Sequence, residues 1–495
     1  MTIGKLIDDE GVVEPGQLAE RIARAMSLFV ASGIREGDAV ALLLRNGRVF
    51  VEATMAAQNL GAYAVPVNWH FAAPEVEYVL RDCGASVLVG DIDLLADLRG
   101  AIPPTVAVFA AGCADGTDVF SSWEASLAAA EPSGLTPRPA VASMIYTSGT
   151  TGKPKGVRRL PMSAAQAAAV GDIRRTIYAH EPDMRALLSA PLYHSAPNFF
   201  GINTLRCGGT LILRRRFDAK DTLRLIDAEA ISHMFMVPTM FVRLLALGEP
   251  ARAGFSGRSL RWVLHAGAPC PPDVKSAMID WWGPVLSEYY GSTELGPLTF
   301  CTSSEWLSHR GTVGRALEGV ALTVRDTEGA PCADGVAGEI CVEAMPQADF
   351  TYHGDEAKRR AVDTGAGLAT GDIGYRNAQG YYFICDRRTD MIISGGVNIY
   401  PAEIEAALMG IGGIADTAVV GMPDAEFGEA VLAFVQLEPG AALGEAEIAG
   451  ALRERIAGYK VPREIRFTDA LPRDDSGKIF KRRLRDQIAM PAREG

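Results

Sequence analysis

The sequence predicts an α/β fold, with a large N-terminal domain followed by a small α+β C-terminal domain. Short apolar runs with strand character alternate with longer Ala- and Leu-rich runs with helical character, a pattern typical of α/β proteins with largely parallel sheets. The chain has 495 residues, of which 48% are hydrophobic and 22% charged. That composition supplies a large core and excludes general disorder.

Three strand–helix pairs justify the α/β prediction for the N-terminal domain. The run AVALLLRN (39–46) predicts a strand, and VFVEATMAAQNLG (49–61) predicts the helix after it. A second strand is expected at 210–217, with a helix at 218–230. A third is expected at 261–269, where a Gly/Pro turn precedes another helix.

The last hundred or so residues form a pattern of their own. A strand at 380–388 precedes a helix that Pro401 opens and glycines close at 410–413. Strands follow at 417–424 and 430–438, and a helix at 445–460 carries apolar residues at i, i+4 and i+8. We therefore expect domains at 1–386 and 387–495.

Charge and cysteine content exclude several classes of protein. The net charge of −12 argues against a broad nucleic-acid-binding surface. The eight cysteines form no CxxC pair or zinc-type cluster, and they indicate free thiols in a reducing compartment. No signal peptide, lipidation box or run of 18 apolar residues is apparent, so we expect a cytoplasmic protein without an integral membrane segment.

A loop suited to phosphate follows the strand-like run at 141–146. It reads YTSGTTGKPKGV (146–157) and combines small residues, hydroxyls and two lysines. Small residues let backbone N–H groups approach phosphate oxygens, and lysines add positive charge. The loop is not a Walker A motif, because Pro154 follows Gly152-Lys153. The alternative is an ordinary surface turn, which this composition disfavours.

This loop resembles the signature of the adenylate-forming superfamily, and six further motifs follow in that family's order. They are PLYHSAPN (191–198), HAGAPCPP (265–272), EYYGSTELG (288–296), TGD (370–372), DRRTDMIISGGVNIYPAEIE (386–405) and LPRDDSGKIFKRR (471–483). The resemblance is to the acyl-CoA and aryl-CoA synthetase branch. It implies a large multi-sheet N-terminal domain, a small mobile C-terminal domain, and adenylation followed by thioester formation at one site.

The resemblance also implies how ATP and Mg²⁺ are bound. Glu294 would hold Mg²⁺ on the phosphates, Thr293 would donate to the α-phosphate, and Tyr290 would stack on adenine. Asp372 would accept from the ribose hydroxyls, which a carboxylate can do twice, with Arg387 as a second contact. The loop residues expected to bind phosphate are Thr147, Ser148, Gly149, Thr150, Thr151, Gly152, Lys153 and Lys155.

The C-terminal domain is expected to supply a catalytic lysine and the path for coenzyme A. By resemblance, Lys478 would bridge the substrate carboxylate and the α-phosphate. The domain would rotate about Thr389, where relatives usually have Asp or Lys; Asp386 and Asp390 are alternative pivots. The residues expected to contact CoA are Gly395 and Gly396 of the glycine turn, Phe427, Tyr459 and Lys460, with Arg463 as an alternative cation.

The acid is expected to bind beside His194, a residue that resembles a mobile wall of the acyl pocket and that we group with the catalytic residues. Ser195 stands where amino-acid-activating relatives have Asp, so an α-amino acid is disfavoured. The pocket walls expected at 194–200, 237–241, 265–268 and 289–293 include Gly267, Ala268 and Gly291 but no cation. They favour an apolar aliphatic or aromatic monocarboxylate. Arg206 and Arg243 lie just outside and leave a dicarboxylate open.

Other functions share part of this pattern. The nearest is a stand-alone adenylation enzyme that loads a carrier-protein thiol; a luciferase-like oxygenase is another. A non-catalytic nucleotide-binding regulator would be expected to lack Glu294 or Lys478, and both are present. The expected partners are therefore ATP, Mg²⁺, CoA and a carboxylic acid, without nucleic acid. Monomer and homodimer both remain open.

Overall fold

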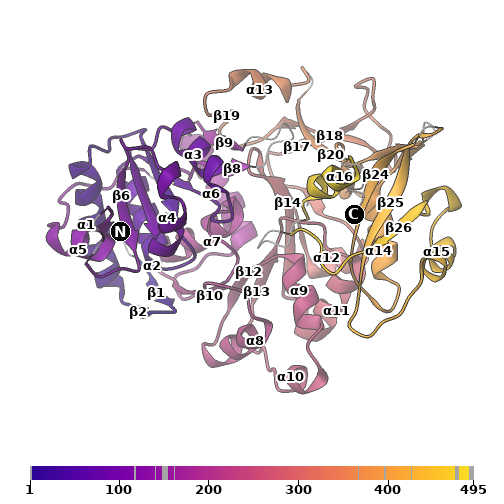
Figure 1. Ribbon diagram of the computed structural model, residues 1–495, viewed down its shortest axis with the longest axis horizontal. Helices are drawn as coiled ribbons and strands as arrows, with labels where there is room; N and C mark the ends of the chain where they lie inside the picture. The colour runs from indigo at the N-terminus through magenta and orange to yellow at the C-terminus, as the bar shows by residue number, and fades with distance from the viewer. Residues whose placement is uncertain are drawn as a thin grey trace, which may run out of the picture.

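The computed structural model describes residues 3–489 apart from 116, 118, 140, 148–153, 161, 366, 395–396, 425 and 474–478. Within them the chain forms four sheets, the largest with thirteen strands that cross the middle of the molecule (Figure 1). The parallel half of this sheet contains β11 (Thr210–Leu213), β10 (Arg185–Leu188), β12 (His233–Met236), β13 (Trp262–His265) and β14 (Leu286–Ser292), with β1 (Lys5–Asp8) and β2 (Gly11–Val13) at its edge.

The other half of the large sheet is antiparallel. It contains β15 (Gly296–Thr302), β16 (Gly314–Ala316), β21 (Tyr381–Arg387), β20 (Leu368–Arg376), β18 (Gly338–Ala344) and β17 (Ala321–Arg325). The sequence pattern predicted a largely parallel sheet, and this half differs from that prediction. A parallel pair needs a long crossover, whereas strands such as β14 and β15 are joined by a short turn that permits only antiparallel pairing.

Helices complete the α/β part around the parallel strands. They are α6 (Ala164–Tyr178), α7 (Ser195–Arg206), α8 (Ala219–Ala228), α9 (Pro238–Leu245), α10 (Glu249–Ala253), α11 (Pro272–Trp282) and α12 (Ser303–Ser308), with α13 (Glu356–Ala361) further along the chain. The N-terminus of α8 follows from its sequence, because Asp218 accepts a hydrogen bond from the backbone N–H of Asp221 at 2.8 Å. The strand–helix alternation predicted around 210–230 is confirmed.

A parallel five-stranded sheet forms the N-terminal lobe. Its strands are β4 (Tyr63–Pro66), β3 (Ala39–Leu43), β5 (Val87–Asp91), β6 (Ala107–Ala111) and β7 (Ser121–Ser122). Helices α1 (Pro15–Ala31), α2 (Arg48–Asn59) and α5 (Trp123–Ala129) pack on one face, and α3 (Ala73–Asp82) and α4 (Ile92–Asp97) on the other. Alternate residues of β3 therefore enter two different cores: Val40 and Leu42 enter one, Ala41 and Leu43 the other.

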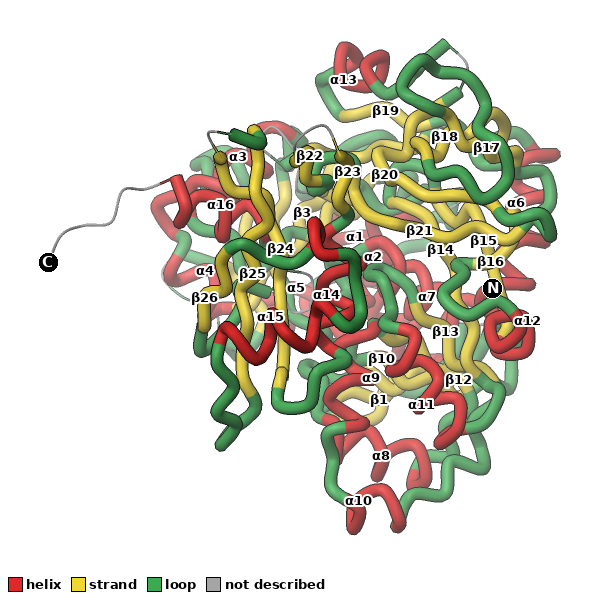
Figure 2. Tube along the Cα trace, turned by 90° about the vertical axis from the view of Figure 1, so that its right-hand side faces the viewer, coloured by secondary structure: helices red, strands yellow, loops and turns green. Residues whose placement is uncertain are grey.

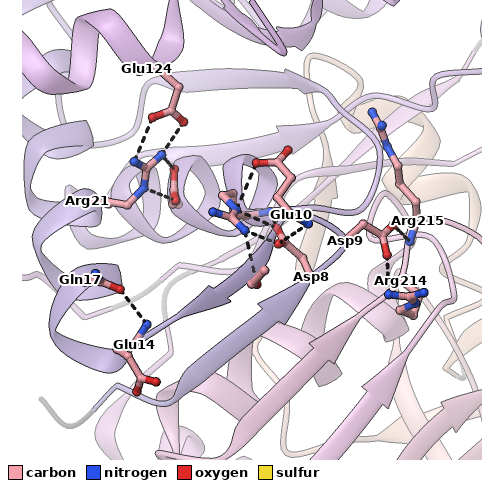
Figure 3. Close-up of polar contacts among 12 residues, drawn as sticks. Asp8, Asp9, Glu10, Glu14, Gln17, Arg21, Glu124, Arg214 and Arg215 are labelled. Atoms are coloured by element: carbon pink, nitrogen blue, oxygen red, sulfur yellow. Dashed lines mark hydrogen bonds and ion pairs between the residues drawn. The ribbon is translucent and has the colours of Figure 1, made fainter. Parts of the chain in front are cut away.

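Ion pairs fix this lobe to the large sheet (Figure 3). Arg48 at the start of α2 pairs with Asp8 at the end of β1, with 2.5 Å between Nη2 and Oδ1. Arg21 on α1 contacts both Glu52, which is fully buried, and Glu124 on α5. Both carboxylates lie 2.6 Å from the guanidinium. Each of these half-buried cations thus has an anionic partner.

A three-stranded sheet places the two ends of the phosphate loop side by side. It contains β8 (Ile145–Thr147), β9 (Lys155–Arg159) and β19 (Phe350–Tyr352). β8 and β9 are antiparallel, and Thr147 is paired with Lys155. The intervening residues 148–153 lie outside the described part of the chain.

The C-terminal region has a five-stranded sheet of its own (Figure 2). The sheet contains β23 (Val397–Ile399), β22 (Ile392–Ser394), β25 (Gly428–Leu437), β24 (Ile414–Asp424) and β26 (Glu464–Phe467). Val431 and Ala433 face α14 (Pro401–Met409) and α15 (Glu445–Arg453), whereas Leu432 and Phe434 face α16 (Lys481–Ala489). The helix expected at 445–460 ends earlier, and 458–460 form a short 3₁₀ turn beginning at Gly458. The domain boundary at 386/387 stays a prediction.

Candidate active site

Strand pairing brings the YGSTE and TGD motifs into contact. Asp372 on β20 is the register partner of Arg387 on β21, and its carboxylate lies 2.8 Å from Arg387 Nε. The Tyr290 hydroxyl, on β14, donates to Asp372 Oδ2 at 2.6 Å. Burial raises the pKa of Tyr290 well above its usual value, so the phenol stays protonated and remains a donor. Asp372 is therefore a carboxylate held in place by two donors, with only 5% of the residue exposed.

Glu294 contacts one end of the phosphate loop and a tyrosine of the three-stranded sheet that holds the loop. Its Oε1 accepts from Thr147 Oγ1 and from the Tyr352 hydroxyl, each at 3.3 Å. Lys155 Nζ lies 5.1 Å from the centre of the Tyr352 ring, so a cation borders the same carboxylate. The three-stranded sheet and the turn after β14 thus place a carboxylate, two hydroxyls and an ammonium group around one point.

This arrangement fits a magnesium ion carried by ATP phosphates. Among the described residues, no group of three or more His, Cys, Asp or Glu side chains could hold a metal by itself. Mg²⁺ does not require one, because it is commonly bound through one or two carboxylates together with substrate phosphates and water. Glu294 would supply the carboxylate, and the ion would neutralise phosphate charge.

Thr293 joins the nucleotide side of the site to the start of α7. Its hydroxyl lies 3.1 Å from Ser195 Oγ, in the first residue of that helix. Its backbone oxygen accepts from Arg159 Nη2 at 3.1 Å. Arg159 also donates to the backbone oxygen of Ala348, at 3.3 Å, so it connects the strand after the phosphate loop to this turn.

The remaining predicted acid-binding residues lie at strand ends and helix starts. His194 is the N-cap residue of α7, and its ring centroid is 4.4 Å from that of Tyr193. Gly267, beside Ala268, follows β13 with φ of +90°, which favours glycine. A Cβ on Gly291 would lie 2.1 Å from the backbone oxygen of Gly296, so the irregular turn of β14 requires glycine there.

The predicted CoA contacts are placed apart from this cluster, on the C-terminal region. Phe427 and Tyr459 are 38% and 58% exposed. The Arg463 guanidinium lies 4.9 Å from the Phe427 ring centre, and Lys460 Nζ is 2.6 Å from Glu403 Oε1. Within the described residues, these side chains contact only C-terminal neighbours.

Several predicted site residues lie outside the described part of the chain. They are Gly395, Gly396 and Lys478, and the loop residues Ser148, Gly149, Thr150, Thr151, Gly152 and Lys153.

Sequence reasoning missed two residues of this cluster, Tyr352 and Arg159. Tyr352 lies on β19, in no motif, and reaches Glu294 only because β19 pairs with β9. Arg159 follows the phosphate loop by a few residues. In the sequence, the only signal for a role of Arg159 was its position in the strand that follows the phosphate loop.

Replacing Asp372 by alanine should weaken ATP binding. The change removes a buried hydrogen-bond acceptor. Losing a hydrogen bond to a charged group lowers binding affinity by about 10–100-fold. We expect the KM for ATP, measured by pyrophosphate release, to rise by that factor. Asp334→Ala is a matched control, because Asp334 pairs with Arg376 in an exposed ion pair of the same β-region. An unchanged KM for ATP in Asp372→Ala would contradict the ribose-binding role.

Family models match both parts of the chain. Residues 13–346 match the AMP-binding enzyme family and residues 403–478 match the AMP-binding enzyme C-terminal domain. No helix in the described residues is long and apolar enough to cross a membrane.

Curated relatives and solved structures agree with this match. A feruloyl-CoA synthase of an Amycolatopsis species is 35% identical over 95% of this chain and 92% of its own length. A fatty acid–[acyl-carrier-protein] ligase of Streptomyces coeruleorubidus is 32% identical over 95% and 90%. The structure of the o-succinylbenzoate CoA synthetase of Bacillus subtilis, in complex with an acyl-adenylate, has a TM-score of 0.82 at 28% identity and covers 100% of this chain and 96% of that one. This protein, whose chain joins a phosphate-loop region to Glu294 and Asp372, therefore belongs to the family of AMP-binding enzymes.

Proposed function

We propose that the protein is an ATP-dependent carboxylic acid–CoA ligase that forms an acyl-adenylate and then an acyl-CoA thioester. The observation that carries this proposal is the convergence on Glu294 of Thr147 and Tyr352, which border the phosphate loop. A second anionic anchor, Asp372, lies on β20 of the large sheet that also contains β14. These two carboxylates suit a nucleoside triphosphate, with Mg²⁺ bound at Glu294 and the ribose bound at Asp372.

In the first half-reaction the substrate carboxylate attacks the α-phosphorus of ATP, and pyrophosphate leaves. Two anions approach one another in this step, so catalysis depends on positioning and charge neutralisation. Thr293 lies between Glu294 and the start of α7, where it can donate to an α-phosphate oxygen while Ser195 orients its hydroxyl. Lys478 completes this arrangement as the cation that follows the developing charge.

In the second half-reaction a thiol attacks the acyl carbon, and AMP leaves. We assign the thiol to CoA because Phe427 and Tyr459 offer exposed aromatic surface on the C-terminal region and because the sequence resembles CoA ligases at Gly395 and Gly396. Phe427 and Tyr459 are partly exposed, as a stacking surface for adenine requires. The Lys460–Glu403 ion pair would open when a CoA phosphate binds. A cytoplasmic location belongs to this proposal, supported by eight cysteines that are all unpaired.

The acid belongs to the aliphatic or aromatic carboxylic acids. Ser195 provides no negative charge for an α-ammonium group, so free amino acids should be poor substrates. A carrier-protein thiol in place of CoA is the alternative, which the relative from Streptomyces coeruleorubidus illustrates.

Product analysis tests the proposal. Purified protein with ATP, Mg²⁺, CoA and a panel of carboxylic acids should yield AMP, pyrophosphate and acyl-CoA in equal amounts. ADP as the stoichiometric product would contradict the reaction type. AMP formation that depends on a carrier protein and not on CoA would favour the carrier-protein alternative. Rapid turnover of any α-amino acid would overturn the prediction that Ser195 disfavours amino-acid substrates.

A further inference from the structure

Two half-buried arginines near α7 have no anionic partner among the residues that the structure describes. The Arg174 guanidinium, on α6, lies 4.3 Å from the centre of the Phe199 ring. Arg206, at the end of α7, donates from Nη2 to Gln58 Oε1 at 2.7 Å, and Gln58 is neutral. The buried Nε of Arg206 has no hydrogen-bond partner among the described residues. No described carboxylate lies within 4 Å of either guanidinium.

Several other half-buried arginines of this chain are paired with carboxylates, whereas Arg159 donates to backbone oxygens. Arg21 contacts buried Glu52 within the N-terminal lobe (Figure 3), Arg48 contacts buried Asp8 on β1, and Arg359 contacts Asp349 at 2.8 Å. A cation that loses water without gaining an anion destabilises the fold. The arrangement at α6 and α7 is therefore unfavourable unless an anion from outside the chain completes it.

The electrostatic surroundings strengthen this conclusion. Burial and, to a smaller extent, the nearby charge of Arg174 lower the pKa of Arg206 to about 10. Arg159 is affected in the same way and also has its pKa lowered to about 10. Arg174 thus lies within electrostatic range of both Arg159 and Arg206. Only Arg159 has carboxylates, Glu294 and Asp349, in its electrostatic surroundings.

The helix geometry connects these arginines to the reaction centre. Ser195, Phe199 and Arg206 are spaced by four and seven residues, so they share one face of α7. The axial rise places Phe199 about 6 Å and Arg206 about 16 Å from Ser195. The Tyr178 ring lies 4.8 Å from that of Phe199 and 6.0 Å from that of Tyr289, beside Tyr290. An aromatic wall therefore runs from the nucleotide strand to Arg174.

We infer that Arg174 and Arg206 bind a second carboxylate of the acid substrate, so that the enzyme activates one end of an apolar dicarboxylic acid. The inference rests on the proposed function and names its substrate class. A guanidinium presents donors in a planar fork that matches a carboxylate. The aromatic wall would contact the carbon chain or ring between the two carboxylates. Arg243, the other cation considered from the sequence, is exposed on α9.

Matched pairs of acids test this assignment. We expect adipate to be preferred over hexanoate, and terephthalate over 4-methylbenzoate, in kcat/KM for AMP formation. Arg174→Met should lower each diacid-to-monoacid ratio by about 10–100-fold, the effect of losing charge-assisted hydrogen bonds. Arg206→Gln should lower it in the same direction. Arg175→Met is the control: Arg175 is the next residue of α6, exposed and paired with Asp172, and its loss should leave the ratios unchanged.

A binding measurement separates this inference from the proposed function. Without ATP, adipate should raise the melting temperature of the wild-type protein more than hexanoate does, and Arg174→Met should abolish the difference. That result would support the second carboxylate site even if no acid were adenylated. Preference for the monoacid in both pairs, with ratios unaffected by a folded Arg174→Met or Arg206→Gln protein, would overturn the inference. Equal stabilisation by sulfate and adipate would also overturn it.

Discussion

Replacing Lys478 by alanine is expected to slow adenylate formation by about 10²–10³-fold, the scale of removing one preorganised electrostatic group. In the proposed mechanism, the ammonium group stabilises charge only while the bond between the acyl oxygen and phosphorus forms. Attack of CoA on chemically supplied acyl-adenylate should therefore remain nearly intact. Single-turnover measurement of the two half-reactions, with pyrophosphate release and thioester formation as readouts, determines this ratio.

The residues that flank Lys478 are fixed to the C-terminal sheet. Arg473 and Ile479, on either side of the 474–478 segment, form an isolated antiparallel bridge and lie side by side. Arg473 Nη2 lies 2.5 Å from Asp416 Oδ1 on β24, and Lys481 Nζ lies 2.8 Å from Glu405 Oε1. Arg482→Ala is the control, because Arg482 is an exposed cation of the same segment. An equal loss of rate in both half-reactions of Lys478→Ala would contradict a role of Lys478 in adenylation alone.

Replacing Thr389 by proline should slow thioester formation and leave adenylate formation nearly unchanged, the reverse of the result expected for Lys478→Ala. Asp390 N donates to Arg387 O at 3.0 Å, so Thr389 occupies the third position of a turn directly after β21. Proline fixes its own φ and restricts Arg388 before it. The change should trap one arrangement of the two domains, with adenylation within a few-fold of wild type and thioester formation lower by about 10²-fold or more, as expected when a gating motion is lost.

The contacts around Thr389 favour it as the pivot over its neighbours. Asp386 accepts from the backbone N–H of Ala402 at 2.8 Å, and Asp390 pairs with Arg485 at 2.6 Å. Thr389 itself is exposed. Thr389→Ala keeps backbone freedom and serves as the control. An unchanged rate of thioester formation in a folded Thr389→Pro protein would place the hinge at Asp386 or Asp390.

Continuous motifs in the sequence were the source of several predicted site residues, whose roles stay predictions. Glu294, Asp372 and Tyr290 were predicted from short runs, and the structure brings Tyr290 and Asp372 into direct contact. Their proximity follows from strand order, which residue spacing does not encode. Tyr352 could not be predicted, because its contact with Glu294 depends on the pairing of β19 with β9 across almost two hundred residues.

Arg174 shows a second limit of sequence reasoning. It lies in an Ala-rich helix beside Arg175, and the two residues are chemically identical. Only the packing of α6 against α7 distinguishes them, because it turns Arg174 onto the Phe199 ring and leaves Arg175 in solvent with Asp172. The antiparallel half of the large sheet was missed for a related reason: strand direction depends on how each connection folds.

The residues assigned to the nucleotide lie on strands, whereas those assigned to the acid lie on helices. This difference affects how such enzymes can diverge. Tyr290, Asp372 and Arg387 are on hydrogen-bonded strands, where a change of register would disturb every neighbour. Phe199 and Arg174 project from two helices that lie outside the strand ladder of that sheet. Mutation can therefore exchange one acid for another along α6 and α7 while the nucleotide chemistry is inherited intact, and directed evolution of a new acyl specificity should begin with those two helices.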